Sequence, residues 1–337
     1  MKAIIQKGGE MMLNEISIEV IRQCPNNCLH CSSSSNTNCS EMMPLDKFKE
    51  VVSDAVKLGA KSICLSGGEP FQHTDILELV KYVHEKNLNC YIYTSGIILD
   101  KSGKPSALPV QLINSISEYV TKLIFNVEAA SESTYDLIMG TKNCFTKLQE
   151  SIKRTVEASI IVEAHFVPMK LNYHEIDAVV ELCIQLKVSR ISFLRLVLHG
   201  RAKINKEVLQ LSNEEYKLVK DKLQVLKNQS QLNIRIGVPL SDNNPCVKCE
   251  AACGKLNIKY DGKVFPCEVF KNFALFEKVF DCHPTSVYEE SLENIYYHSQ
   301  YLQCVRDISQ TYSRTASNDL CVGQYLMSNK MEDLKNE

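Results

Sequence analysis

Apolar and polar positions along the first two thirds of the chain follow two different periods. Short runs rich in β-branched residues recur roughly every thirty residues, and each is followed by a segment with helical periodicity. The runs cover residues 16–22, 62–66, 89–94, 122–127, 160–167 and 190–196. Six strand–helix units in series predict a parallel α/β sheet with right-handed crossovers. Six periods rather than eight predict an open, partial (β/α)6 barrel.

Two of the intervening segments carry explicit helix signals. In the first, apolar residues at helical spacing predict one buried face made of Phe48, Val51, Val52, Ala55 and Val56. Gly59 is the expected stop signal of this helix. In a later segment, Asn172 and Glu175 have the spacing of a capping box, which predicts a helix start there.

The pattern changes after about residue 200. A helix is expected over 213–227, opened by a capping box of Ser212 and Glu215, and a strand over 232–236. Two short strand-like runs then flank Asp261-Gly262, which predicts a β-hairpin. We therefore expect a core over residues 1–202, a connecting helix and strand over 203–240, and a small hairpin-and-helix domain over 241–337.

Composition narrows the class of protein. The chain has 337 residues and a formal net charge of −2, with no Trp, which argues against a nucleic-acid partner. It contains no apolar run of ~20 residues, so no membrane span is expected. The first thirteen residues lack the apolar stretch of a signal peptide, which predicts a cytoplasmic location. Fifteen cysteines in such a chain are expected to be metal ligands, reactive thiols or core residues.

A first group of cysteines follows the first predicted strand. Cys24, Cys28 and Cys31 lie within eight residues. Three thiolates can hold three corners of a 4Fe–4S cluster and leave the fourth iron open to a small molecule. Zinc is the alternative, with His30 as a fourth ligand, although adjacent His30 and Cys31 would strain tetrahedral closure on one ion.

This spacing resembles the signature of the radical S-adenosylmethionine (SAM) superfamily, and the resemblance extends over about residues 16–202. His30 departs mildly from the family, which usually has an aromatic residue before its third cysteine. The second strand ends in Gly67-Gly68-Glu69-Pro70, which is similar to the motif that binds the SAM amino group. Two glycines allow close backbone approach to a ligand, and a carboxylate can accept hydrogen bonds from an ammonium group.

The resemblance implies further cofactor contacts at later strand ends. Ser95 stands in a Thr-Ser-Gly turn after the third strand, near the expected cofactor. Asn126 and Glu128 end the fourth strand, where polar side chains of the family meet the ribose. Arg195 ends the sixth strand and is expected to face the SAM carboxylate, because a guanidinium forks onto carboxylates.

The resemblance also implies the chemistry. A reduced 4Fe–4S cluster donates one electron to SAM, which yields methionine and a 5′-deoxyadenosyl radical, and the radical abstracts a hydrogen atom from the substrate. An external one-electron reductant of the flavodoxin or ferredoxin type is then a required partner.

A second group of cysteines lies near the predicted hairpin. Cys253 and Cys267 flank it, and Cys246 and Cys249 precede it. The segment resembles the start of the twitch and SPASM domains, which bind an auxiliary 4Fe–4S cluster. Cys249, Cys253 and Cys267 are the first choices as ligands, and the fourth is Cys246 or Cys321, with Cys246 favoured by proximity. A structural zinc knuckle is the alternative.

The leading hypothesis is therefore a radical SAM enzyme with one auxiliary cluster. We favour a peptide substrate, although only 23 residues precede Cys24, too few for a separate leader-peptide-binding domain. Oxidation or rearrangement of a small molecule, such as a sugar, aminoglycoside or nucleotide, is the alternative. A non-catalytic iron–sulfur or zinc protein is the alternative of another class, and the Gly67–Pro70 motif argues against it.

Overall fold

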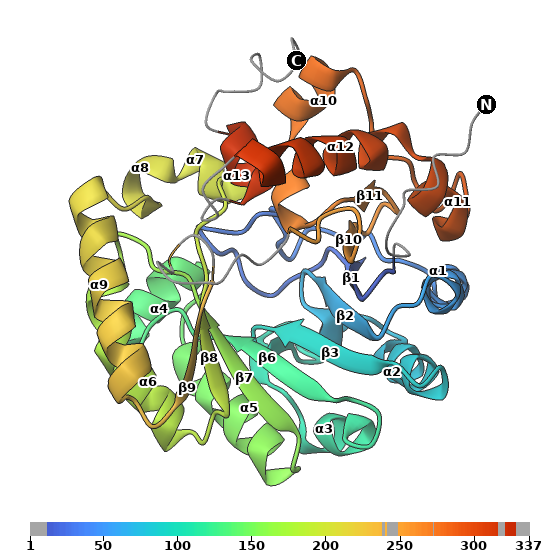
Figure 1. The fold of residues 1–337 in the computed structure, drawn as a ribbon. Helices are drawn as coiled ribbons and strands as arrows, with labels where there is room; N and C mark the ends of the chain where they lie inside the picture. The colour runs from blue at the N-terminus through green and yellow to red at the C-terminus, as the bar shows by residue number, and fades with distance from the viewer. Residues whose placement is uncertain (1–11, 238–239, 241–248, 272, 316–320, 328–337) are drawn as a thin grey trace.

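A nine-stranded sheet forms the centre of the protein in the computed structural model, which describes residues 12–237, 240, 249–271, 273–315 and 321–327 (Figure 1). Its strand order is β11-β10-β1-β2-β3-β6-β7-β8-β9. Every neighbouring pair is parallel except β10 and β11. The strands are β1 (Glu15–Ile21), β2 (Ser62–Gly67), β3 (Asn89–Thr94), β6 (Lys122–Asn126), β7 (Ile161–Phe166), β8 (Arg190–Phe193), β9 (Asn233–Ile236), β10 (Lys255–Ile258) and β11 (Val264–Phe265).

Helices cover the outer side of this curved sheet, and the last helices of the chain lie at one end of it (Figure 1). A separate antiparallel pair, β4 (Ile97–Leu99) and β5 (Pro105–Ala107), follows β3. The α-helices are α1 (Leu45–Lys57), α2 (Ile76–Glu85), α3 (Val110–Ile116), α4 (Glu132–Met139), α5 (Phe145–Glu157), α6 (Ile176–Gln185), α7 (Gly200–Ile204), α8 (Lys206–Leu209), α9 (Asn213–Gln229), α10 (Ala274–Phe280), α11 (Leu292–His298), α12 (Gln300–Thr315) and α13 (Val322–Met327). Short 3-10 turns are η1 (Pro70–Gln72), η2 (Tyr173–Glu175) and η3 (Glu268–Phe270).

The six strands predicted from periodicity are confirmed as β1, β2, β3, β6, β7 and β8, and the parallel, open α/β architecture is confirmed with them. The structure extends this sheet at both edges. Strand β9 pairs in parallel with β8, and the predicted hairpin joins the other edge because β10 pairs in parallel with β1. The carboxyl ends of the parallel strands therefore meet at one edge, where loops carry side chains toward a common site.

Two local predictions need correction. Val56 is 40% exposed, because it is rotated about 100° from Ala55 and points away from the buried face of α1. The capping box expected at Asn172 does not form. Glu175 instead accepts hydrogen bonds from the backbone N–H groups of Ala130 and Ser131, and helix α6 begins only at Ile176.

The capping box of Ser212 and Glu215 at the start of α9 is confirmed. Four cysteines interpreted as core residues are fully buried, namely Cys64, Cys90, Cys144 and Cys183.

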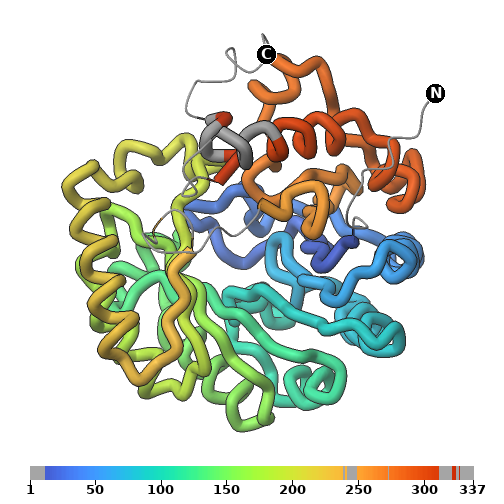
Figure 2. Tube along the Cα trace, in the orientation of Figure 1, coloured from blue at the N-terminus to red at the C-terminus, as the bar shows by residue number. Residues whose placement is uncertain are grey.

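The last third of the chain lies beside the first third, although they are far apart in sequence (Figure 2). Strand β10 continues the sheet next to β1, helices α11 and α12 lie beside the hairpin, and α10 packs on α12 (Figure 1). Their buried contacts are aromatic, with Phe276 packing on Phe270 at 5.3 Å and on Tyr301 at 5.4 Å between ring centroids. This packing holds the segment that follows Cys267 against α10 and α12.

Candidate functional site

The three-cysteine loop leaves β1 and carries its thiols into a largely buried setting. Cys24 is 7% exposed, and Cys28 and Cys31 are half-buried. Burial raises the pKa of the Cys24 thiol, and the neighbouring Cys28 and Glu69 raise that pKa further. Burial and the neighbouring Cys31 likewise raise the pKa of Cys28. Thiols that lie this close and this buried become thiolates only when a cationic centre compensates their charge.

The Gly67–Gly68 turn packs directly on the backbone that leads into Cys24. Gly68 N–H donates to Ile21 O at 2.6 Å, and Glu69 N–H donates to Gln23 O at 2.8 Å. A Cβ on Gly68 would lie 2.0 Å from Gln23 O, and Gly67 has a φ of +131°. The contact that demands glycine here is therefore with the cysteine loop itself, whereas close approach to a ligand stays a prediction.

The other side of the loop rests on two helices. Leu29 N–H donates to Ile138 O at 2.8 Å, at the end of α4. Arg201, on α7, donates from Nε to Cys28 O at 2.7 Å and from Nη2 to Ser35 O at 2.8 Å. Asn205 Nδ2 donates to Leu29 O at 3.0 Å. Sequence reasoning missed this support, because nothing in the local pattern of α7 indicates which distant carbonyls it faces.

Glu69 is completely buried and joins the ends of β2 and β3. Its Oε1 accepts from Thr94 Oγ1 at 2.6 Å and from Phe71 N–H at 3.4 Å. Its Oε2 accepts from Ser95 Oγ at 2.6 Å and from Ser95 N–H at 2.9 Å. Burial raises the pKa of Glu69, against the opposing effect of the hydrogen bonds from Ser95 and Thr94.

These contacts place Ser95 beside Glu69 of the predicted Gly67–Pro70 motif. Pro70, the last residue of the motif, begins η1. A carboxylate has about four lone-pair positions, and the protein uses four of them at Glu69. A contact of Glu69 with the SAM ammonium stays a prediction.

Glu128 lies beside the cysteine loop. It is 1% exposed, its Oε1 lies 3.4 Å from His30 Nε2, and its Oε2 accepts from Val167 N–H at 2.9 Å. Asn126 stands half-buried at the end of β6. The predicted contacts of Asn126 and Glu128 with a ribose remain predictions.

The donor set fits a cluster better than a single ion. Among the residues that the structure describes, no three His, Cys, Asp or Glu side chains gather tightly enough for one metal ion. A zinc site needs sulfur ligands at about 2.3 Å from one centre, whereas a 4Fe–4S cluster takes its thiolates on separate irons. His30 faces Glu128 rather than completing a Cys₃His set.

The second cysteine group gathers residues from distant parts of the chain. Burial raises the pKa of Cys267 to about 12, and Cys321 is the strongest neighbouring charge that adds to this shift. Burial also raises the pKa of Cys249, and Cys321 and Cys253 both add to it. Cys249, Cys253, Cys267 and Cys321 therefore lie near one another. Cys246 falls outside the described residues.

Arg195 contacts this second group. Its Nη2 lies 3.2 Å from Cys321 Sγ. Its expected contact with the SAM carboxylate stays a prediction, and the partner it has in the structure is a candidate auxiliary ligand.

A buried lysine connects the two cysteine segments. Lys271, only 1% exposed, donates from Nζ to Glu19 Oε1 at 2.5 Å and also pairs with Glu268. Ser32 Oγ, next to Cys31, donates to Glu268 at 3.1 Å. Burial alone would lower the pKa of Lys271, but Glu19 and Glu268 outweigh it and raise that pKa.

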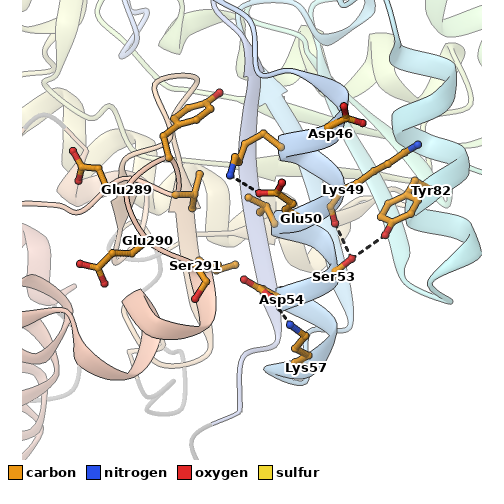
Figure 3. Close-up of a pocket in the computed structure, with 15 residues that line it drawn as sticks. Asp46, Lys49, Glu50, Ser53, Asp54, Lys57, Tyr82, Glu289, Glu290 and Ser291 are labelled. Atoms are coloured by element: carbon orange, nitrogen blue, oxygen red, sulfur yellow. Dashed lines mark hydrogen bonds and ion pairs between the residues drawn. The ribbon is translucent and has the colours of Figure 1, made fainter.

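A groove of about 740 Å³ lies elsewhere, between α1 and the segment that leads into α11 (Figure 3). Charged side chains such as Asp46, Lys57 and Glu289 line it. None of the candidate site residues contributes to this groove.

The protein is thus an α/β protein whose strand-end loops carry three neighbouring cysteine thiols at the carboxyl edge of an open parallel sheet. Residues 18–183 match the family model of the radical SAM superfamily, and this range contains Cys24, Cys28, Cys31 and the Gly67–Pro70 turn. The chain therefore carries a radical SAM domain and is a radical SAM enzyme. The resemblance inferred from the cysteine spacing is confirmed. The family uses a 4Fe–4S cluster and SAM.

The chain is similar to a PqqA peptide cyclase of Rhizobium meliloti (strain 1021), with 26% identity over 86% of this chain and 74% of the relative. It is also similar to an Fe-coproporphyrin III synthase of Methanosarcina barkeri (strain Fusaro / DSM 804), with 28% identity over 53% of this chain and 43% of that relative. The structure of Streptococcus suis SuiB bound to its precursor peptide SuiA shares the fold, with a TM-score of 0.70, 17% identity, and coverage of 88% of this chain and 67% of SuiB.

Within the part of the chain that the structure describes, no helix has the length and apolar character needed to cross a membrane.

Proposed function

We propose that this enzyme modifies a peptide substrate by radical SAM chemistry and uses one auxiliary 4Fe–4S cluster. The observation that supports this proposal most strongly lies within the matched domain: the Gly67–Pro70 turn is hydrogen-bonded to the backbone that leads into the three-cysteine loop. The similarity to a PqqA peptide cyclase over 86% of the chain supports a peptide substrate. The fold shared with a peptide-bound enzyme is consistent with this proposal.

Cys24, Cys28 and Cys31 would hold the first cluster. When bound, the reduced cluster and SAM supply a 5′-deoxyadenosyl radical that takes a hydrogen atom from the substrate. The residues around the loop fix it in place: the Gly67–Gly68 turn from one side, and Arg201 with Asn205 from the other. Such support keeps an open coordination position in a constant geometry.

Glu69, Thr94 and Ser95 fix the ends of β2 and β3 beside this loop. The predicted roles of Gly67, Gly68, Glu69, Pro70 and Ser95 toward the methionine part of SAM, and of Asn126 and Glu128 toward its ribose, belong to this proposal. Their common position at the carboxyl edge of the sheet supports it.

Cys249, Cys253, Cys267 and Cys321 are the proposed ligands of the auxiliary cluster. The electrostatic interactions of Cys321 with Cys249 and Cys267 support it as the fourth ligand, whereas Cys246, the other candidate, lies outside the described residues. Four protein thiolates would ligate this cluster fully, so it would exchange electrons rather than bind substrate. A reductant of the flavodoxin or ferredoxin type and a cytoplasmic location complete the proposal.

The similarity to an Fe-coproporphyrin III synthase favours a second candidate, a small-molecule substrate. That similarity covers 53% of the chain, and its 181 residues are too few to include both Cys24 and Cys267, so the peptide proposal has the wider support.

The first test removes the first cluster. In anaerobically reconstituted protein, changing Cys24, Cys28 and Cys31 together to Ala should remove about four irons per chain and abolish reductive formation of 5′-deoxyadenosine. Cys183→Ala, in the buried face of α6, is the matched control and should retain both. Unchanged SAM cleavage in the triple variant would refute the assignment.

The second test removes the auxiliary cluster. Cys253→Ala with Cys267→Ala should lower iron by about four per chain, leave SAM cleavage partly intact and block product formation from a peptide substrate. Full iron content and normal turnover in this double variant would contradict the auxiliary cluster.

A further inference from the structure

Two arginines from different elements reach the second cysteine group. Arg195 follows β8 and places Nη2 at 3.2 Å from Cys321 Sγ. Arg306 lies on α12 and is only 3% exposed. Its Nε donates to Ala252 O at 2.9 Å, and its Nη2 donates to Tyr296 O at 2.6 Å.

Arg306 is held beside Cys253 by hydrogen bonds to backbone oxygens, and one of its guanidinium nitrogens makes none among the described residues. Ala252 is the residue before Cys253, and Tyr296 Oη donates to Cys253 O at 2.8 Å. Within the described part of the chain, the buried Nη1 of Arg306 has no hydrogen-bond partner. A buried guanidinium N–H without an acceptor is costly, and Cys253 is the cysteine whose side chain interacts electrostatically with Arg306. A ligand thiolate is such an acceptor.

The first cysteine group has a different environment. Arg201 is the guanidinium beside that loop, and its side chain donates to the backbone oxygens of Cys28 and Ser35. The contact of Arg195, in contrast, is with a sulfur atom. The two cysteine groups are therefore not equivalent in the donors that face their sulfurs.

We infer that Arg195 and Arg306 donate N–H groups to the ligand sulfurs of Cys321 and Cys253 and thereby raise the reduction potential of the auxiliary cluster. This inference rests on the proposed function. An added electron makes a four-thiolate cluster more negative, so nearby cations and N–H donors stabilise the reduced form more than the oxidised form. The two arginines are positioning and electrostatic residues, and they make this centre a better electron acceptor.

The test measures the potential directly. In the full chain with Cys24, Cys28 and Cys31 changed to Ala, the auxiliary cluster is the remaining iron–sulfur centre, and a redox titration followed by electron paramagnetic resonance reports its midpoint potential. Arg195→Gln and Arg306→Gln should each shift this potential to a more negative value. Arg195→Lys keeps the charge but loses the planar fork, and should give an intermediate value.

The control is Arg154→Gln. Arg154 lies on α5, donates to Leu108 O at 2.6 Å and belongs to neither cysteine group, so the potential should not change. If Arg306→Gln does not fold, the midpoint potential of Arg195→Gln alone tests the inference, because Arg195 is only half-buried and its replacement is better tolerated. A full complement of about four irons with an unchanged potential in the Gln variants overturns the inference. Absence of iron while both arginines are intact overturns the auxiliary cluster itself.

Discussion

At the scale of single residues, Glu69 shows how one buried side chain fixes a site. Its oxygens accept from Thr94, Ser95 and Phe71, so it connects the loop after β2 to the end of β3. Because it is fully buried, each of these hydrogen bonds acts in an environment with little competing water. The same position lies next to the backbone that leads into Cys24. A substitution of Glu69 therefore affects the cofactor site in either case, whether Glu69 contacts SAM directly or only fixes Thr94 and Ser95.

Glu69→Gln should weaken SAM binding by about 1.5–3 kcal/mol, the range for hydrogen bonds to charged groups, and leave iron content unchanged. Equilibrium dialysis with reconstituted protein measures the affinity. Thr94→Val is the matched comparison, since it removes the hydrogen bonds of the Thr94 hydroxyl with Glu69 and with Gly96 N–H but keeps the carboxylate. A direct contact with the ammonium predicts a larger loss for Glu69→Gln than for Thr94→Val, and wild-type affinity in Glu69→Gln would argue against any role in binding.

At the scale of elements, local sequence signals predicted most of the fold. Asp261-Gly262 between two short apolar runs predicted the β10–β11 hairpin, because its turn chemistry is local. The three-cysteine loop was found because its signal is also local: Cys24, Cys28 and Cys31 lie within eight residues. The pairing of β10 with β1 was not found, because it joins segments far apart in sequence and periodicity reports only on neighbours. For the same reason the sequence left Cys246 and Cys321 as alternative fourth ligands. Asn172 and Glu175 do not form the predicted capping box, because their side chains bond to residues of another segment. Asn172 donates to Glu128 O, and Glu175 accepts from Ala130 N–H.

The sheet itself carries a charged cross-strand ladder. Glu163 on β7 accepts from Lys122 on β6 at 3.0 Å and from Arg190 on β8 at 2.7 Å. Burial alone would raise the pKa of Glu163, but the hydrogen bonds from Arg190 and Lys122 outweigh burial and lower that pKa. A carboxyl whose pKa is lowered by folding stabilises the folded state above its ordinary pKa of 4.5, and this contribution is lost as the pH falls through the folded pKa.

Wild-type protein should therefore melt at a higher temperature than Glu163→Gln at neutral pH. The difference should shrink as the pH falls below 4.5, because the wild-type carboxyl then becomes protonated. Thermal melts from neutral pH into this acidic range measure the difference. A gap between the two proteins that stays constant across the range would show that the ladder is not the source of the stability.

At the scale of the whole molecule, the last third of the chain completes the sheet that the first third begins (Figure 2). The domain boundaries at about residues 202 and 240 stay a prediction, and β9 and β10 on either side of the second boundary both belong to the central sheet. Lys271 makes a buried ion pair in this arrangement. It reaches Glu19 on β1, and its other partner, Glu268, contacts Ser32 beside Cys31. The two cysteine segments therefore share one ion-pair network, in which Lys271 and Glu19 are buried and Glu268 is exposed.

Lys271→Met should be strongly destabilising, because it leaves the buried Glu19 carboxylate without its cation. Removing one partner of a buried ion pair costs about 3–5 kcal/mol, so the melting temperature should fall clearly. Hydrogen exchange at residues 31–33 should rise at the same time, because the contact of Lys271 with Ser33 is lost and Glu268, which accepts from Ser32, loses its cation. Adding Glu19→Gln should recover part of the stability by removing the unpaired charge. Lys57→Met is the control, since the ion pairs of Lys57 lie on the surface and are largely screened by solvent. A Lys271→Met protein with wild-type melting and unchanged exchange at residues 31–33 would show that the two cysteine segments are held together by other contacts.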